Sequence, residues 1–154
     1  MSTPEDRIKE LKLELPTPPK PMAKYKSAVR YGNLLYVSGH GPLKTDGTMI
    51  QGKLGADMNT EQGKEAARVV GLTILATVRN TLGSLNKVKR LIKAFGMVNA
   101  TPDFQEHPFV INGFSELMAE VFGDDAGVGA RSAIGMVSLP NNIAVEIECV
   151  FEVE

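Results

Sequence analysis

The strongest constraint on the fold is a stretch of strict alternation, VEIECVFE, at residues 145–152. Successive side chains of a β-strand point to opposite faces, so alternation of this kind predicts a strand with one face against a core. The predicted core face carries Val145, Ile147, Cys149 and Phe151, and the opposite face carries Glu146, Glu148 and Glu152.

A second β-type run begins at Gly129 and ends at a Leu-Pro-Asn-Asn break, residues 139–142. If this break is a turn between paired strands, residues whose numbers sum to about 281 stand opposite each other, an estimate that depends on turn length. Ala133 then faces Glu148, and Gly135 faces Glu146. Opposite residues share a face, so Arg131 and both glutamates are expected on the side that the apolar residues avoid.

The start of the chain predicts a short helix and an extended arm. Thr3 followed by Pro4 is typical of a helix start, and the helix is expected to run to about Lys12. Leu15 to Pro21 holds four prolines and cannot continue it. We therefore expect residues 1–21 to form an N-terminal helix with a proline-rich arm, and residues 22–154 to form one domain.

The remaining segments predict a mixed sheet with two helices on one of its faces. The exposed face would still carry Val29 or its neighbours, together with Ala133 and Val150, which favours self-association. The expected elements are a hairpin over 27–38 around Gly32-Asn33, a helix from an Asn59/Gln62 capping box to about Gly83, a strand over Val88 to Asn99, a helix from about Pro108, a flexible loop over Gly123 to Gly129, and the final hairpin.

Composition excludes several classes of site. A net charge of −1 argues against a nucleic-acid partner, and no apolar run reaches the roughly twenty residues of a membrane span. The N-terminus lacks the apolar core of a signal peptide, so a cytoplasmic location is expected. His40 and His107 lack metal-ligand spacing and no dinucleotide motif is present, so no metal or cofactor is implied. Cys149 is interpreted as a small core residue.

Arg131 is the best candidate for a ligand-binding residue. Its neighbours Gly129, Ala130, Ser132 and Ala133 are small and leave room around the guanidinium. Such a planar fork can bind a carboxylate through two parallel hydrogen bonds. Glu146 and Glu148 could either neutralise the arginine or hold a water for attack.

Six motifs together resemble the Rid/YjgF family, the reactive intermediate deaminases formerly called endoribonuclease L-PSP. The similarity covers roughly Lys24 to Val153, and the motifs are specific in combination. They are Tyr25, Gly32-Asn33 with Ser38-Gly39, Asn112, Ala130-Arg131-Ser132, Leu139-Pro140, and Val145-Glu146-Ile147-Glu148.

The resemblance implies a chorismate-mutase-like α+β fold, a homotrimer and three clefts between neighbouring subunits. It also implies cofactor-free hydrolysis of 2-imino or enamine acids to 2-keto acids and ammonia, as in 2-iminobutanoate/2-iminopropanoate deaminases. Arg131 matches the carboxylate-binding arginine of the family and Glu146 its water-associated glutamate. Tyr25, Ser38, Gly39 and Asn112 match residues that line the cleft, some of them from the neighbouring subunit.

The chain departs from the family at two positions near the expected site. Ala133 stands where cysteine is frequent, and His40 follows Ser38-Gly39 where glutamine is frequent. Two other functions stay open at this point. One is a trimer that binds a small 2-keto acid without turning it over. The other is the endoribonuclease of the older family name, against which the near-neutral charge counts.

Overall fold

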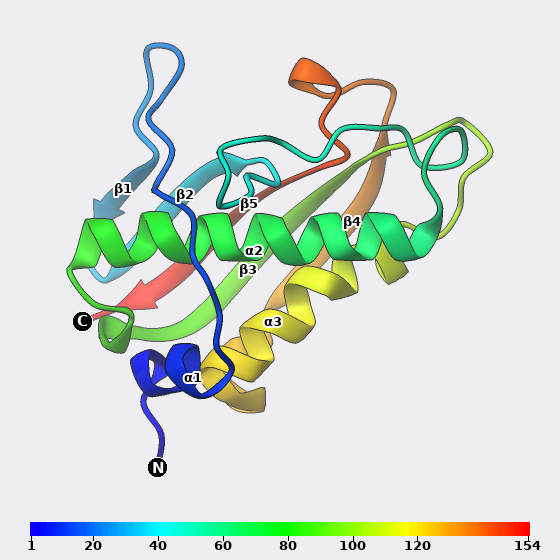
Figure 1. Ribbon diagram of the computed structural model, residues 1–154. Coiled ribbons are helices and arrows are strands. Elements are labelled where there is room, and N and C mark those ends of the chain that lie inside the picture. Colours follow the sequence, from blue (N-terminus) through cyan, green and yellow to red (C-terminus); the bar gives the residue numbers. More distant parts are fainter.

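The computed structural model describes residues 1–154 and contains a five-stranded mixed sheet whose helices lie on one face (Figure 1). The strand order is β1-β2-β5-β3-β4. The strands are β1 (Ala28–Tyr31), β2 (Leu34–His40), β3 (Val88–Asn99), β4 (Ala130–Met136) and β5 (Val145–Val153). The α-helices are α1 (Pro4–Glu10), α2 (Thr60–Leu82) and α3 (His107–Gly127), and two 3₁₀ turns cover Leu85–Lys87 and Pro140–Asn142.

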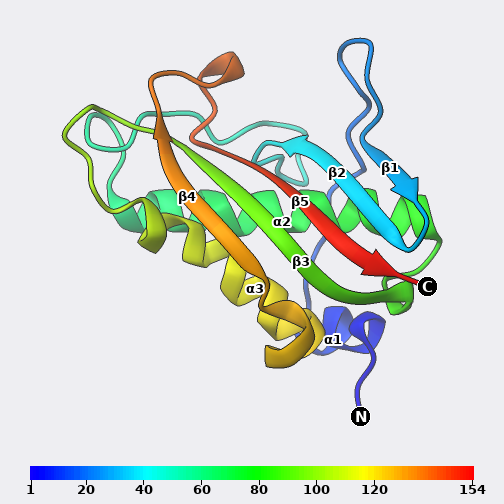
Figure 2. The ribbon, with the colours of Figure 1, turned by 180° about the vertical axis from the view of Figure 1, so that it is seen from behind.

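The sheet combines antiparallel pairs with one parallel pair. β5 lies between β2 and β3 and is antiparallel to both. β3 and β4 are parallel, with Ala94 opposite Arg131 and Val98 opposite Gly135. Parallel neighbours require a crossover, and α3 supplies it. The long axis of α3 therefore lies beside β4 on the helix-covered face, as Figures 1 and 2 both show.

The hydrophobic core fills the space between the sheet and the helix pair α2/α3. Ile147 and Phe151 of β5 are fully buried there, together with Ile74 of α2 and Phe114 of α3. Gly96 on β3 allows close packing, because a Cβ at that position would lie 2.6 Å from Cδ1 of Ile111. Seen from behind in Figure 2, the opposite face of the sheet has no helix over it. No helix combines the length and the apolar content needed to cross a membrane.

The short helix α1 is fastened to the ends of α2 and α3. Ile8 is buried in the core, and the Glu5 carboxylate pairs with Arg79 at 2.6 Å while accepting from the Leu85 amide at 2.9 Å. Arg7 donates to the carbonyl of Glu120. The helix start at Thr3 thus matches the expectation from sequence, with both bonds of a capping box present.

Several other expected elements are confirmed. β1 and β2 form the hairpin around Gly32, and Asn59 caps α2 together with Gln62. α2 ends at Gly83 in the left-handed conformation that favours glycine, with φ of 84°. β3 covers the residues assigned to it from sequence. The expected loop from residue 123 to 129 is wrong in part, because helical structure continues to Gly127 beyond a break at Gly123, where φ is 88°.

The expected pairing of the last two strands is wrong. β4 and β5 are not neighbours, because β3 lies between them. The connection over residues 137–144 passes over the end of β3, so it is no hairpin turn. It is held instead by the loop before α2, where the Gly52 amide donates to the Asn142 carbonyl and the Gln51 side chain donates to that of Asn141. The expected opposition of Ala133 to Glu148 and of Gly135 to Glu146 does not exist.

Candidate functional site

Arg131 lies on the helix-covered side of β4, at the edge of the sheet. Its Nη1 donates to the Ser115 hydroxyl at 3.1 Å and its Nη2 to the Pro108 carbonyl at 3.2 Å, both on α3. The guanidinium is half-buried and has no carboxylate partner. Two neutral acceptors thus orient a charge that remains free for an anion.

Asn112 lies on the same side of α3 as the groups that hold Arg131. It follows Pro108 by four residues and precedes Ser115 by three, the spacing of one helix face. Ala133 and Gly135 come next along the same side of β4. Both are small, so the surface beyond the guanidinium is not filled by the strand itself. We call Arg131, Asn112 and Ser115 the arginine corner.

Glu146 lies on the opposite, helix-free face of the sheet, which we call the open face. It pairs across the ladder with Met97 and is half-buried. Burial raises the pKa of the Glu146 carboxyl above its ordinary value, and the nearby Glu148 carboxylate adds to this effect. No cation forms an ion pair with Glu146. Its carboxyl is therefore closer to exchanging a proton at neutral pH than an ordinary surface glutamate.

Gly39 brings the β2 backbone against this glutamate. A Cβ on Gly39 would lie 2.3 Å from Oε2 of Glu146 and would clash with it. Only glycine therefore leaves room for the carboxylate in this position. The pairing of β2 with β5 shifts register between Val37 and His40, which is the bulge that re-aims this segment. Gly39 and Glu146, two of the candidates from sequence, are thus in contact.

The bulge is fixed from inside by His40. This buried side chain contacts the Ser38 carbonyl through Nδ1 at 2.5 Å and the Thr77 hydroxyl of α2 through Nε2 at 2.8 Å. A carbonyl can only accept, so Nδ1 carries the proton and Nε2 accepts from Thr77. Burial lowers the pKa of His40, which keeps the ring neutral. The residue after Ser38-Gly39 therefore ties the bulge to α2.

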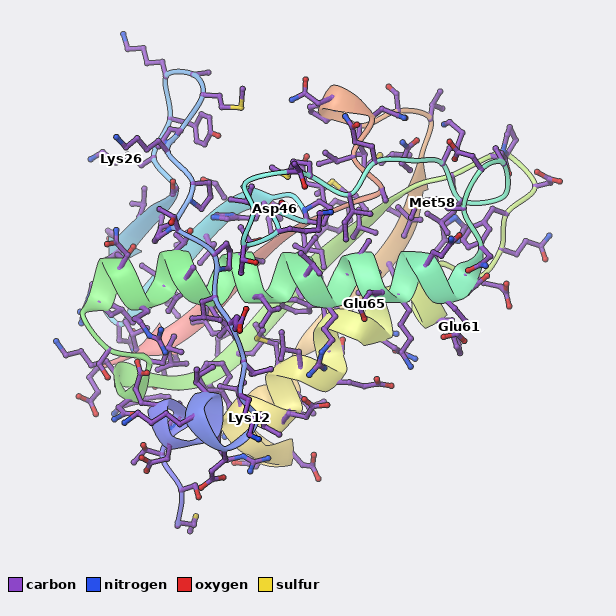
Figure 3. The ribbon with its side chains drawn as sticks, viewed as in Figure 1. Lys12, Lys26, Asp46, Met58, Glu61 and Glu65 are labelled. Carbon is purple, nitrogen blue, oxygen red and sulfur yellow. The ribbon has the colours of Figure 1, made fainter.

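Ser38 lies on the open face, and Tyr25 lies in the segment that Ser38 contacts. The Ser38 hydroxyl donates to the Lys26 carbonyl at 2.6 Å, which ties β2 to the segment before β1. Figure 3 labels Lys26 in this segment, which projects beyond the sheet. Tyr25, the preceding residue, is 49% exposed. Its ring is therefore available to a second molecule.

The structure separates the predicted site residues into two groups. Arg131 and Asn112 lie at the arginine corner, whereas Glu146 and Gly39 lie on the open face with Ser38. The expectation that Arg131 shares a face with the two glutamates is wrong. The reason is the parallel pairing of β4 with β3, which turns residues 131, 133 and 135 toward α3. Ala133, which was expected on the open face, lies on the helix side for the same reason.

The open face is hollowed beside Glu148. A pocket of about 360 Å³ lies over β2, β5 and β3, with Glu148 on its wall. Its apolar side chains include Val29 and Tyr36, each 50% exposed, and its polar ones include Ser38. Exposed apolar area of this kind on a sheet face is typical of an interaction surface.

A second pocket, of about 460 Å³, was not foreseen from the sequence. It lies at the end of β4, and two basic side chains, Lys53 and His107, line it. Its other lining residues are Ala100, Thr101, Pro102, Phe104, Gly135, Met136 and Val137. These residues come from three separate segments, so only the fold brings them together. No group of three or more His, Cys, Asp or Glu side chains could hold a metal ion.

Comparison with known proteins gives one family. The family model described as "YjgF/chorismate_mutase-like, putative endoribonuclease" matches residues 5–151. Protein TCP17 of Trypanosoma cruzi is 37% identical over 145 residues, which cover 94% of this chain and 91% of the relative.

Two crystal structures show the same fold over almost the whole chain. A protein of unknown function from Agrobacterium tumefaciens is 41% identical with a TM-score of 0.90, over 98% of this chain and 92% of the other. A Shewanella oneidensis protein that carries the same endoribonuclease description is 30% identical with a TM-score of 0.94, over 99% and 100% of the two chains. The chain belongs to the Rid/YjgF family and has its mixed α+β, chorismate-mutase-like fold.

Proposed function

We propose that this protein is a cofactor-free hydrolase that converts 2-imino or enamine acids to 2-keto acids and ammonia. In this reaction Arg131 binds the substrate carboxylate, and Glu146 positions the attacking water. The observation that carries the proposal is an oriented guanidinium without a carboxylate partner. Family membership adds to it, since the family model spans both residues.

The arginine corner suits the carboxylate of a small acid. Ser115 and Pro108 fix the guanidinium, so little conformational freedom is lost when a ligand binds. Two parallel hydrogen bonds would then hold the carboxylate plane and orient the adjacent C=N carbon. Asn112, one helical turn away, could contact the imine end of the same ligand.

Glu146 supplies the proton handling. Its carboxylate accepts a proton from water as the oxygen adds to the C=N carbon and passes it to the imine nitrogen, which gives a carbinolamine. It then accepts the hydroxyl proton and passes it to the amino nitrogen as the C–N bond breaks, so that the C=O bond forms and ammonia leaves. A carboxylate whose pKa is raised by burial accepts a proton more readily than an ordinary glutamate does. Ser38 and the backbone at Gly39 lie beside it as hydrogen-bonding groups.

The two groups lie on opposite faces of the sheet, so one chain alone does not complete the site. A second copy must bring its open face, with Glu146, against the β4 edge of the first. The half-apolar pocket on the open face and the projecting segment around Tyr25 favour such an association. We propose a homotrimer with three equivalent sites, each shared by two subunits.

Mixed oligomers test this arrangement. Imino acids are generated in situ from alanine by an amino-acid oxidase, and ammonia release is followed with and without the protein. Arg131→Ala and Glu146→Gln should each lower the acceleration about a hundredfold or more. When the two variants are co-expressed, a site shared between subunits regains both native groups in about one quarter of cases. Activity should then return to about that fraction.

Matched variants make the result specific. Glu152→Gln changes a glutamate further along the same strand as Glu146, and Arg90→Ala removes an arginine of β3 that pairs with Asp125. Both should keep the native rate. Saturable binding of a 2-keto acid with no effect on imine lifetime would show that the protein binds the acid without hydrolysing imines. A mixture as inactive as its parents would refute the shared site.

A further inference from the structure

We propose that the pocket lined by Lys53 and His107 is an anion-binding subsite for a second carboxylate, so that the preferred substrate is the imine of an acidic, dicarboxylic amino acid. This inference rests on the proposed function, since it places the first carboxylate on Arg131. The pocket has a volume of about 460 Å³ and no acidic side chain in its lining. We call it the Lys53 pocket.

The pocket is continuous with the surface that begins at Arg131. Gly135 lines the pocket and lies on the same side of β4 as Arg131, roughly 13 Å along the strand. The arginine side chain reaches the carbonyl of Pro108, the residue that directly follows His107. Only the small side chain of Ala133 lies between them on the strand. A ligand held by Arg131 can therefore extend toward the pocket without meeting a bulky β4 side chain.

His107 is oriented by its neighbours. Its ring packs edge to face against Phe104, with centroids 5.2 Å apart at an interplanar angle of 87°. A Cβ on Gly135 would lie 2.6 Å from Nε2 of His107, so the imidazole edge rests directly on the strand backbone. A larger residue at 135 would displace it. The ring nitrogen is thus held at the wall of the pocket as a hydrogen-bonding group.

Lys53 brings a positive charge that no carboxylate neutralises. Its backbone is fixed at the end of β3, where the Leu54 amide donates to the Asn99 carbonyl and Thr101 donates back to Leu54. The ammonium donates to the Val137 carbonyl at 2.5 Å and forms no ion pair. Figures 1 and 2 both show the loop before α2 beside the end of β4.

The acids closest in sequence are engaged elsewhere. Asp57 accepts from the backbone amide of Lys53, not from its ammonium, and Asp103 accepts from the Thr101 hydroxyl. Glu106, directly before His107, accepts from the Thr60 hydroxyl of α2. In a chain with a net charge of −1, an acid-free pocket with the Lys53 ammonium in its wall is a local positive field. The chemistry that fits it is a second carboxylate, at the end of the ligand opposite the carboxylate on Arg131.

Calorimetry with two keto acids of equal length tests the subsite without requiring turnover. 2-Oxoglutarate and 2-oxopentanoate differ only in the terminal carboxylate. The native protein should bind 2-oxoglutarate about tenfold more tightly, because a charge-assisted contact adds to the shared Arg131 contact. Lys53→Met should remove this preference and leave 2-oxopentanoate binding unchanged. His107→Gln should reduce it in part.

Lys44→Met is the matched control, because Lys44 lies in the same loop outside the pocket and pairs with Asp46. It should retain the tenfold preference. Equal affinities in the native protein, no binding of either acid, or a preference that survives in Lys53→Met would overturn the subsite. The proposed hydrolysis is judged separately. A preference for the dicarboxylate without imine turnover would support the subsite and refute the proposed hydrolysis. Imine turnover without this preference would support the hydrolysis and refute the subsite.

Discussion

The two faces of β5 differ in what covers them and in what their side chains can do. On the helix side Val145, Ile147 and Phe151 are fully buried in one core. On the open face Glu146 is half-buried and Glu148 exposed, with no ion pair for either. One strand therefore presents a packed face and a charged face at alternate residues.

This difference separates stability from chemistry. The apolar area buried on the helix side stabilises the fold, and the glutamates on the open face do not contribute to this burial. A desolvated carboxyl with no cation beside it costs free energy, so its place on the open face needs another reason. Sites that break a packing rule in this way are where function is expected.

The largest effect should come from the packed face. Phe151 is fully buried and packs against Phe122, with centroids 6.0 Å apart. Phe151→Ala should lower the free energy of unfolding by about 3–5 kcal/mol, because it removes buried apolar area and leaves a cavity. Urea denaturation measures this. Val150→Ala, on the open face of the same strand, should cost under about 1 kcal/mol. Equal losses would erase the contrast between the faces.

An intermediate effect is expected at His40, which joins the bulge of β2 to helix α2. His40→Leu leaves the Ser38 carbonyl and the Thr77 hydroxyl without their partner, at a cost of about 1–3 kcal/mol. Adding Thr77→Val should recover part of this loss, since one orphaned group disappears. Thermal unfolding of the single and double variants measures the coupling. Purely additive losses would show that the bridge contributes nothing.

The same histidine gives a pH dependence of known sign. Burial lowers its pKa below the ordinary 6.5. The unfolded chain therefore takes up the proton first, so stability falls as pH drops below about 6.5. His40→Leu should flatten this part of the profile. If His40→Leu leaves the pH dependence of the free energy of unfolding unchanged, His40 is not buried in its neutral form.

The smallest effect on stability, with the opposite slope, should come from Glu146. Its pKa is raised above the ordinary 4.5, so the folded chain binds the proton more tightly than the unfolded chain does. Stability should then fall as pH rises from about 4.5 through the raised pKa. Glu146→Gln removes this loss and should gain no more than about 1 kcal/mol at neutral pH, since solvent screens a half-exposed group. A loss of stability at neutral pH would make Glu146 structural.

Local signals in the sequence predicted the elements well. The alternation from Val145 to Phe151 is a period of two, and the Asn59 cap and Gly83 stop delimit α2 without reference to the rest of the chain. The small neighbours of Arg131 and the polar face of the last strand named Arg131 and Glu146 as candidates, and the family motifs agreed. Each of these inferences needs only neighbouring residues or a motif.

The arrangement of the site could not be predicted in the same way. Alternation shows that Arg131 points to one side of β4 but does not show which side. The side depends on β3 lying between β4 and β5, a pairing of distant segments. The Lys53 pocket likewise joins residues 53, 100–107 and 135–137. No periodicity links these segments, so only the tertiary structure shows the pocket.

The position of β5 in the sheet has a consequence for how the chain folds. The middle strand is the last of the five to be synthesised, and Leu34 pairs with Glu152, more than a hundred residues away. Until β5 is made, no strand connects the β1-β2 hairpin to the β3-α3-β4 unit, because β5 pairs with both β2 and β3. Loop closure over such separations is slow, so nascent chains should expose two unfinished strand edges that invite pairing with other chains. Protection of these edges during synthesis would set the yield of folded protein.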